Sequence, residues 1–176
     1  MKLIVGAGNT TEPGWLSLNE SDLDVTDAEQ WAAMFAPRSL DAVLAEHVWE
    51  HLTWDEAMAA TRNIAAYLKP GGVLRIAVPD GLHTCQRYLD WVMPGTGFNG
   101  DDHKLLFDYR MLAQLMQSAG LRPVLREWWD EQESFHSNYR ADEEGRIRRS
   151  LNGENFQGLT FLLGCPYTSL IVDGLK

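Results

Sequence analysis

The chain has 176 residues, a formal net charge of -10 and 45% apolar residues. This length favours one domain with a sizeable core. The acidic balance excludes nucleic acid as the main partner, because phosphate binding requires a basic face. No apolar run is long enough for a membrane helix, and the first residues lack a signal-peptide pattern. We therefore expect a cytoplasmic protein with no membrane partner, and its two cysteines, Cys85 and Cys165, are expected to be reduced thiols.

The N-terminal residues predict a strand, Lys2 to Val5, that runs into the glycine loop Gly6-Ala7-Gly8-Asn9. Glycines here allow the backbone to approach a ligand closely, but the third glycine of the dinucleotide-binding pattern is absent. A second strand, Trp15 to Asn19, follows after too few residues for a crossover helix. The loop is thus either a structural turn or a ligand loop. Either a loop without a helix joins the two strands, or the two strands are not neighbours of the usual parallel kind.

The end of the second strand carries Asn19 and Glu20. Nucleotide-binding α/β folds place acceptors for ribose hydroxyls at this position, and a solvated strand end is the equal alternative. Asp22 to Thr26 then predicts a short third strand. Asp27 either caps the helix expected over Ala28 to Phe35 or lies beside a ligand.

The stretch from Leu40 to Asp80 predicts one βαβ unit. Thr53 and Glu56 form a capping box that starts the helix, and Pro70-Gly71-Gly72 ends it before the second strand. Two strands joined by a crossover helix lie parallel. The polar segment Glu46 to His51 therefore lies at the carboxyl end of a strand, where open α/β sheets bind ligands.

The C-terminal half begins with a short helix and a glycine-rich, acidic loop, Gly95 to His103, which is typical of a segment over a site. Asp108 caps the next helix. Strands are predicted at Leu121 to Trp129 and at Tyr167 to Leu175. The residues between them, about 130–155, form a polar insertion.

These features, together with EHVWEH, LKPGGVLRIAVPD, GDDHKLLFDY and YTSLIVDGLK, resemble the class I, Rossmann-like S-adenosylmethionine-dependent methyltransferases. The closest resemblance is to small bacterial members known only as predicted methyltransferases. LKPGG followed by a strand and PD is the most specific part. The resemblance implies one α/β domain over residues 1–176, with a mostly parallel sheet flanked by helices. It also implies an antiparallel C-terminal β-hairpin, with the insertion at its tip and the first crossover helix missing.

The resemblance implies a site for S-adenosylmethionine along the carboxyl ends of the strands. The residues implied to bind the cofactor are Gly6, Ala7, Gly8 and Asn9 for the methionine part, Asn19 or Glu20 for the ribose, Asp27 and Ala28 for the adenine, and Glu46 and His47 for the sulfonium side.

Methyl transfer from a sulfonium is an in-line displacement, so the protein binds and aligns the reactants and supplies a base where the acceptor must lose a proton. His47 and His103 are the candidate bases, because histidine titrates in the working range. The resemblance implies that the acceptor is a small molecule or a saccharide precursor. The seven tryptophans could include an interface patch, which would make the protein a homodimer.

Two other functions compete with this one. His47-Val48-Trp49-Glu50-His51 matches the H-x-x-E-H motif of inverted zinc peptidases. The capping box at Thr53 places this motif before the helix, and no third ligand stands out, so no metal site is expected and a zinc hydrolase is a remote alternative. The short first crossover and Asn19 favour a second alternative, a catalytically inactive methyltransferase-like module for binding or assembly.

Overall fold

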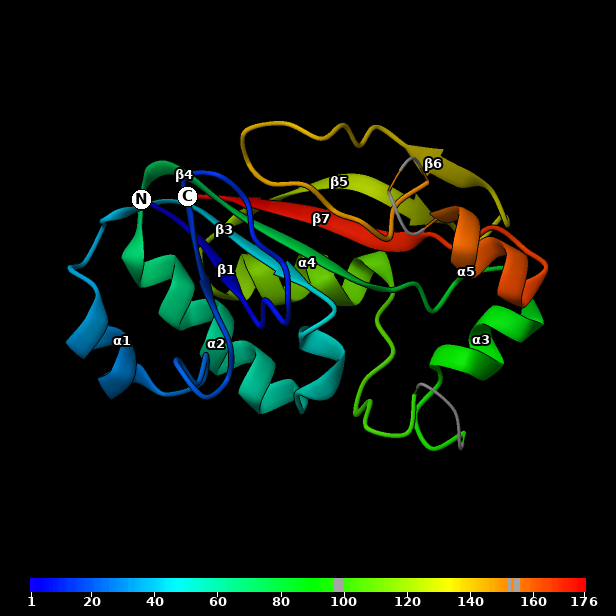
Figure 1. Cartoon of the computed structure of the whole chain (residues 1–176), viewed down its shortest axis with the longest axis horizontal. Helices are drawn as coiled ribbons and strands as arrows, with labels where there is room; N and C mark the ends of the chain where they lie inside the picture. The colour runs from blue at the N-terminus through cyan, green and yellow to red at the C-terminus, as the bar shows by residue number, and fades with distance from the viewer. Residues whose placement is uncertain (97–99, 152, 154–155) are drawn as a thin grey trace.

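The computed structural model describes residues 1–96, 100–151, 153 and 156–176. Within these residues the chain forms a seven-stranded sheet in the order β2-β1-β3-β4-β7-β5-β6 (Figure 1). β2, β1, β3 and β4 are parallel, whereas β7 pairs antiparallel with β4 and β5, and β6 pairs antiparallel with β5. The strands are β1 Lys2–Val5, β2 Trp15–Leu18, β3 Leu40–Glu46, β4 Leu68–Pro79, β5 Arg122–Trp129, β6 Phe135–Ser137 and β7 Ser169–Leu175.

The helices begin where the sequence supplies a side-chain cap. Asp27 caps α1, and Asp108 accepts a hydrogen bond from the Met111 amide at 2.8 Å to cap α4. The capping box of Thr53 and Glu56 is present at α2, as predicted. The helical segments are α1 Ala28–Met34, the 3₁₀ turn η1 Trp49–His51, α2 Trp54–Tyr67, α3 Gln86–Val92, α4 Tyr109–Ser118 and α5 Phe156–Leu163.

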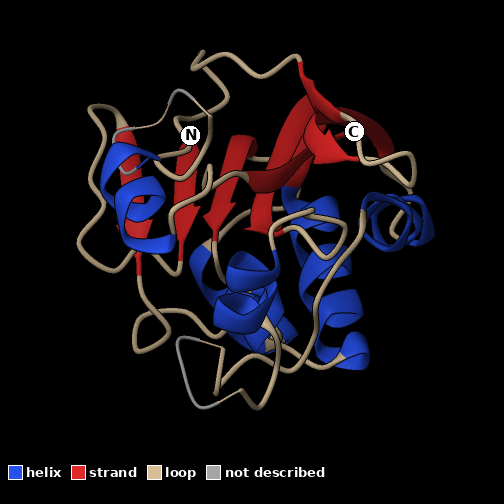
Figure 2. Ribbon diagram, turned by 90° about the vertical axis from the view of Figure 1, so that its right-hand side faces the viewer, coloured by secondary structure: helices blue, strands red, loops and turns tan. Residues whose placement is uncertain are grey.

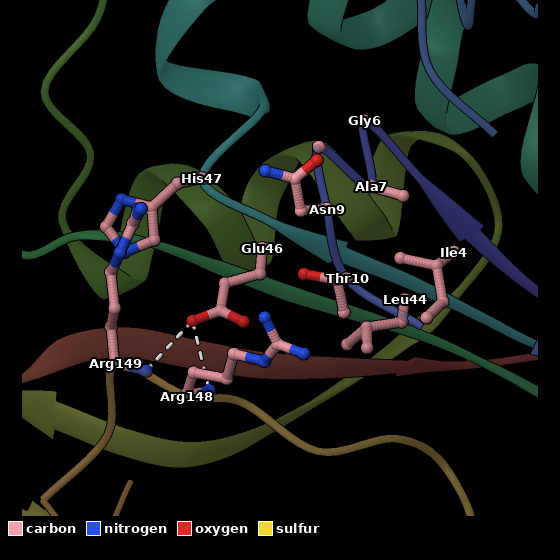
Figure 3. Close-up of a pocket in the computed structure, with 11 residues that line it drawn as sticks. Ile4, Gly6, Ala7, Asn9, Thr10, Leu44, Glu46, His47, Arg148 and Arg149 are labelled. Carbon is pink, nitrogen blue, oxygen red and sulfur yellow. Dashed lines mark hydrogen bonds between the residues drawn. The ribbon is translucent and has the colours of Figure 1, made fainter. Parts of the chain in front are cut away.

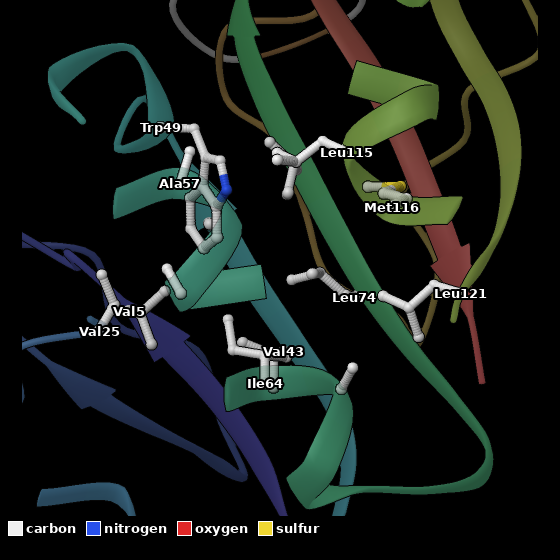
Figure 4. Close-up of a cluster of buried hydrophobic side chains, with 14 of the residues drawn as sticks. Val5, Val25, Val43, Trp49, Ala57, Ile64, Leu74, Leu115, Met116 and Leu121 are labelled. Atoms are coloured by element: carbon white, nitrogen blue, oxygen red, sulfur yellow. The ribbon is translucent and has the colours of Figure 1, made fainter. Parts of the chain in front are cut away.

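The main core lies between one face of the sheet and the helices α1, α2 and α4 (Figures 2 and 4). Alternate strand residues, such as Val5, Val43 and Leu74, point to this face and meet Ile64 of α2 and Leu115 of α4. This alternation follows from the two-residue period of a strand. Burial of this apolar surface holds the helices against the sheet.

The opposite face is covered by a segment without helix, residues 138–151, which we call the strap (Figure 1). Tyr139 and Ile147 of the strap pack on Ile4 and Leu44. On the same face Arg75 is fully buried, and its guanidinium donates to Asp173 at 2.7 Å, to Asp142 at 2.6 Å and to the Gly145 carbonyl at 2.6 Å. The strap is therefore tied to the middle of the sheet by a buried charge.

Two expectations about the strands are confirmed. β1 and β2 are parallel neighbours joined by a loop, so the first crossover helix is missing. β5 and β7 pair antiparallel, as expected of the C-terminal hairpin. The connection between them carries β6, the strap and α5, while residues 152, 154 and 155 of the expected insertion lie outside the described part, as do residues 97–99 of the expected loop.

The prediction of a third strand at Asp22 to Thr26 is wrong, because these residues form no strand. Asp24 accepts hydrogen bonds from the amide and hydroxyl of Thr26, at 2.8 and 2.7 Å, which turns the backbone. The carbonyl of Val25 accepts from Trp31 Nε1 at 3.0 Å and from Asn63 Nδ2 at 3.1 Å. Side chains therefore satisfy this segment in place of a neighbouring strand.

The expectation of reduced cysteines is also wrong, because Cys85 and Cys165 form a disulfide with their Cα atoms 6.5 Å apart. Cys85 precedes α3 and Cys165 follows α5, and the two helices share a small apolar cluster around Tyr88 and Leu163.

Among the described helices, none has the length and apolarity that a membrane crossing requires.

Candidate functional site

Two adjoining cavities lie at the carboxyl ends of β1 and β3, with volumes of about 270 and 550 Å³. Gly6 and His47 line both. The smaller cavity is also lined by Ile4, Ala7, Gly8, Asn9, Thr10, Leu44, Glu46, Arg148 and Arg149 (Figure 3). The larger is also lined by Glu20, Leu23, Asp24, Val25, Thr26, Val48, His51, Leu52, Glu56, Asp102 and Lys104.

The glycine loop forms one wall of the smaller cavity. Gly6 and Gly8 have φ angles of +58° and +55°, a region in which an L side chain is strained. The Thr10 amide donates to the Ala7 carbonyl at 2.7 Å and closes a tight turn. All four residues predicted to hold the methionine part of a cofactor, Gly6 to Asn9, line this cavity.

Asn19 has a different place from the one predicted for a ribose ligand. Its Oδ1 accepts from the Gly8 amide at 2.6 Å, so the side chain ties the glycine loop to the end of β2. Of the two candidates, Glu20 lines the larger cavity, whereas Asn19 belongs to the described residues that line neither.

Asp27 and Ala28, predicted beside the adenine, also lie outside the described cavity walls. The Asp27 carboxylate accepts from the Glu29 amide at 2.8 Å and so performs the capping role that the sequence left as the alternative. The residues preceding it, 23–26, form the wall instead. The sequence does not identify these residues as a wall, because their pattern predicts a strand.

Glu46 anchors the strap at the end of β3 (Figure 3). Its Oε1 accepts from the Arg148 amide at 3.0 Å and from the Arg149 amide at 2.8 Å. Glu46, predicted at the sulfonium side of the cofactor, thus lines the smaller cavity and also holds the segment that covers it. The two arginines were not identified from the sequence, because they are about 100 residues away along the chain.

His47 lies at the junction of the two cavities, with φ at +56°. Its Nε2 is 3.0 Å from Ser169 Oγ, and the Ser169 hydroxyl donates to the Arg149 carbonyl at 2.6 Å. Because the Ser169 hydroxyl donates its proton to the Arg149 carbonyl, it accepts from His47, and His47 Nε2 is the donor. The Nδ1 atom lies 2.8 Å from Glu50 Oε1.

The order Glu50, His47, Ser169 repeats the connectivity of a serine hydrolase triad. Ser169 is fully buried, and its hydroxyl is bound to a carbonyl, so it is not placed to attack a substrate. Burial acts to raise the pKa of Glu50, but the neighbouring His47 outweighs it and the pKa lies below its ordinary value. Glu50 is therefore a carboxylate inside the protein.

The zinc-peptidase arrangement is not formed. Its residues span the end of β3 and the turn η1, whereas the motif requires both histidines on one face of an α-helix. Glu50 and His51 instead group with His103, with ligand atoms within 4.8 Å of one another. His103 is buried and lies 4.9 Å from His51 between ring centroids, outside the described walls of both cavities.

A family model described as a methyltransferase domain matches residues 8–126, more than half of the chain. Similar solved structures include a SAM-dependent methyltransferase from Archaeoglobus fulgidus, with TM-score 0.58, 12% identity and coverage of 99% of this chain and 85% of that one. A second, from Thermotoga maritima, has TM-score 0.59, 14% identity and coverage of 99% and 81%. A third is 1,6-didemethyltoxoflavin-N1-methyltransferase from Burkholderia thailandensis, solved with 1,6-didemethyltoxoflavin and S-adenosylhomocysteine, with TM-score 0.53, 15% identity and coverage of 99% and 70%. The comparison with curated proteins found no significant match.

The fold is that of class I, Rossmann-like methyltransferases, whose cofactor is S-adenosylmethionine. The chain belongs to the methyltransferase-domain family.

Proposed function

We propose that the protein transfers a methyl group from S-adenosylmethionine to a small-molecule or saccharide acceptor. The observation that carries this proposal is the junction of two cavities at Gly6 and His47. One has the glycine loop as its wall and the other has the acidic end of β2. A single elongated ligand with a charged amino-acid end and a ribose fits such a pair.

Carboxylates line both cavities. Glu46 faces the smaller cavity beside Arg148 and Arg149, whereas the larger cavity is mainly acidic, with Glu20, Asp24, Glu56 and Asp102 beside Lys104. A sulfonium ion is positive, and carboxylates nearby stabilise it. Bound S-adenosylmethionine supplies the reactive methyl group, so the chain mainly has to align it and exclude water.

We assign the methionine part to the loop Gly6 to Asn9 and the ribose to Glu20, with Asn19 supporting the loop. Leu23 and Val25, which precede the predicted Asp27 and Ala28 in the chain, offer apolar surface for the adenine, and Glu46 and His47 border the methyl group. His47 is our candidate base. To act as a base at Nε2, the ring must first lose the proton that Nε2 donates to Ser169.

Calorimetry with S-adenosylmethionine tests the proposal. We expect binding at one site, and we expect Gly8→Leu to weaken it at least about tenfold, because the new side chain would project from the cavity wall. Gly14→Leu is the matched control. Both glycines have a positive φ and open space around an added Cβ, but Gly14 is not among the cavity residues.

Two results would contradict this assignment. Absence of binding at millimolar cofactor would favour the inactive binding module, which the sequence offered as an alternative. Equal affinities of the Gly8→Leu and Gly14→Leu variants would remove the glycine loop from the site.

The cytoplasmic location and the homodimer remain predictions. The described apolar side chains that are large and exposed include Phe161 and Leu162 of α5 but no tryptophan.

A further inference from the structure

Glu50 is a buried carboxylate whose charge the described hydrogen bonds do not satisfy. Its side chain is 1% exposed, and within the described residues neither oxygen has a hydrogen-bond partner. His47 Nδ1 is close, at 2.8 Å from Oε1, but the approach is not aligned as a hydrogen bond. The adjacent His47 offsets part of the cost of the buried charge, but Oε2 still lacks a partner among the described residues, and such an oxygen points to a further ligand.

Two imidazoles approach the same carboxylate from different segments. His51 is the next residue in η1, and His103 comes from the loop before α4. The backbone fixes this approach, because the carbonyl of Glu50 accepts from the Lys104 amide at 2.7 Å and from the Leu105 amide at 3.1 Å. Backbone hydrogen bonds of the fold therefore bring the segments of Glu50, His51 and His103 together.

The Nδ1 atoms of His51 and His103 both already have partners in the protein. His103 Nδ1 is 2.7 Å from the Val92 carbonyl, so it carries the proton and leaves Nε2 as the lone-pair atom. His51 Nδ1 lies 3.2 Å from Asp102 Oδ2, which favours the same tautomer. Metal-binding histidines are oriented in this way by a carbonyl or carboxylate behind the ring.

We propose that Glu50, His51 and His103 bind a divalent transition-metal ion of the zinc type. Two imidazoles and a carboxylate are a ligand set that zinc accepts, with a further position open to solvent or substrate. Ligand atoms about 2.0–2.1 Å from a tetrahedral metal are about 3.4 Å apart. The three atoms now lie within 4.8 Å, so a small rotation of the side chains closes the site. The His51 side chain is 37% exposed and has room for that rotation.

The site is on the border of the larger cavity, since His51 and Asp102 line that cavity. An open position on the metal would face it and would suit an acceptor that binds through oxygen. A metal-bound hydroxyl loses its proton more readily than a free one. This role rests on the proposed methyl transfer, whereas the metal site itself does not.

The test uses the full chain after removal of metals with a chelator. Zinc is titrated by calorimetry without cofactor, and cobalt(II) is titrated while its visible absorption is followed. We expect one equivalent of metal and a cobalt spectrum with nitrogen ligands. His51→Ala and His103→Ala should each weaken zinc binding at least about tenfold, because each removes one of three protein ligands. Circular dichroism checks that the variants are folded.

His136→Ala is the matched control. His136 also faces a carboxylate, Asp130 at 2.6 Å, but it lies on β6 outside the group, so its loss should leave zinc affinity unchanged. The proposal is overturned if the wild type binds no stoichiometric zinc or cobalt, or if the folded His51 and His103 variants bind metal as the wild type does. The titration contains no S-adenosylmethionine, so its failure leaves the proposed methyl transfer unaffected, and failure of cofactor binding leaves the metal site unaffected.

Discussion

Gly6 and Gly8 share a left-handed backbone but have different surroundings. A Cβ at Gly6 would lie 2.4 Å from Val48 Cγ2, whereas one at Gly8 would have nothing within 4 Å. We expect Gly8→Ala to cost about 1–2 kcal/mol of stability from backbone strain alone. Gly6→Ala should cost clearly more, because Val48 must also move. Urea unfolding of both variants measures the difference, and equal losses would show that Val48 yields without cost.

Glu127 gives the stability a defined pH dependence. Burial raises its pKa to about 7 from an ordinary value of 4.5, although amides such as that of Leu151 donate to the carboxylate and act the other way. Between pH 4.5 and 7 the folded state therefore binds more protons at this group than the unfolded state, so its contribution to stability falls as pH rises. Above pH 7 the whole penalty is present, up to about 3 kcal/mol.

Glu127→Gln removes this titration. We expect the stability of the variant relative to wild type to improve steadily from pH 4.5 to pH 7 and then to stay level. Glu133→Gln, an exposed position in the same hairpin, serves as the control and should show no such trend. Denaturant unfolding at several pH values provides the measurement. A difference that does not vary with pH would mean that Glu127 keeps its ordinary titration in the folded protein.

At the scale of elements, Asp142 is an accessible side chain that helps to hold the strap. Its carboxylate pairs with buried Arg75 at 2.6 Å and is 38% exposed. Hydrogen bonds to charged groups contribute about 1.5–3 kcal/mol, and partial exposure lowers this. We expect Asp142→Ala to speed hydrogen exchange of the Ile147 and Arg149 amides at least about fivefold. Glu143→Ala, an exposed neighbour, should leave exchange unchanged. If both variants exchange alike, the pair of Asp142 with Arg75 does not hold the strap.

The same elements show what the sequence can predict. Local signals were sufficient for the capping box at Thr53, for the cap at Asp108 and for the bare first crossover, because each depends on residues a few positions apart. Asp22 to Thr26 was misassigned because its apolar residues are buried by α1 and α2 while side chains satisfy its backbone. Periodicity alone does not distinguish such a segment from a short strand.

The candidate site was predicted only in part for a related reason. The glycine loop, Glu20, Glu46 and His47 were found because they follow directly from strand ends. The covering Arg148 and Arg149 come from the strap, and His103 reaches Glu50 through backbone contacts of the following residues. No local pattern encodes those long-range contacts, so the grouping of Glu50, His51 and His103 required the fold.

At the scale of the whole molecule, the disulfide constrains the chain more than any other single bond described. Cys85 and Cys165 are separated by 80 residues, so the loop closed in the unfolded chain is long. Such a cross-link stabilises mainly by lowering the entropy of the unfolded state, by about 3–5 kcal/mol for loops of this length. It also joins α3 to α5, beside the small cluster around Tyr88.

We expect the double variant Cys85→Ser and Cys165→Ser to unfold at lower denaturant, with a loss of about 3 kcal/mol or more. Wild type treated with a reductant should move to the same midpoint, whereas the same reductant should not change the double variant. Alkylation before and after reduction, read by mass, reports whether the thiols are paired in protein isolated without reductant. Oxidised thiols persist in oxidising compartments. Complete alkylation of both cysteines before reduction would restore the reduced-thiol expectation.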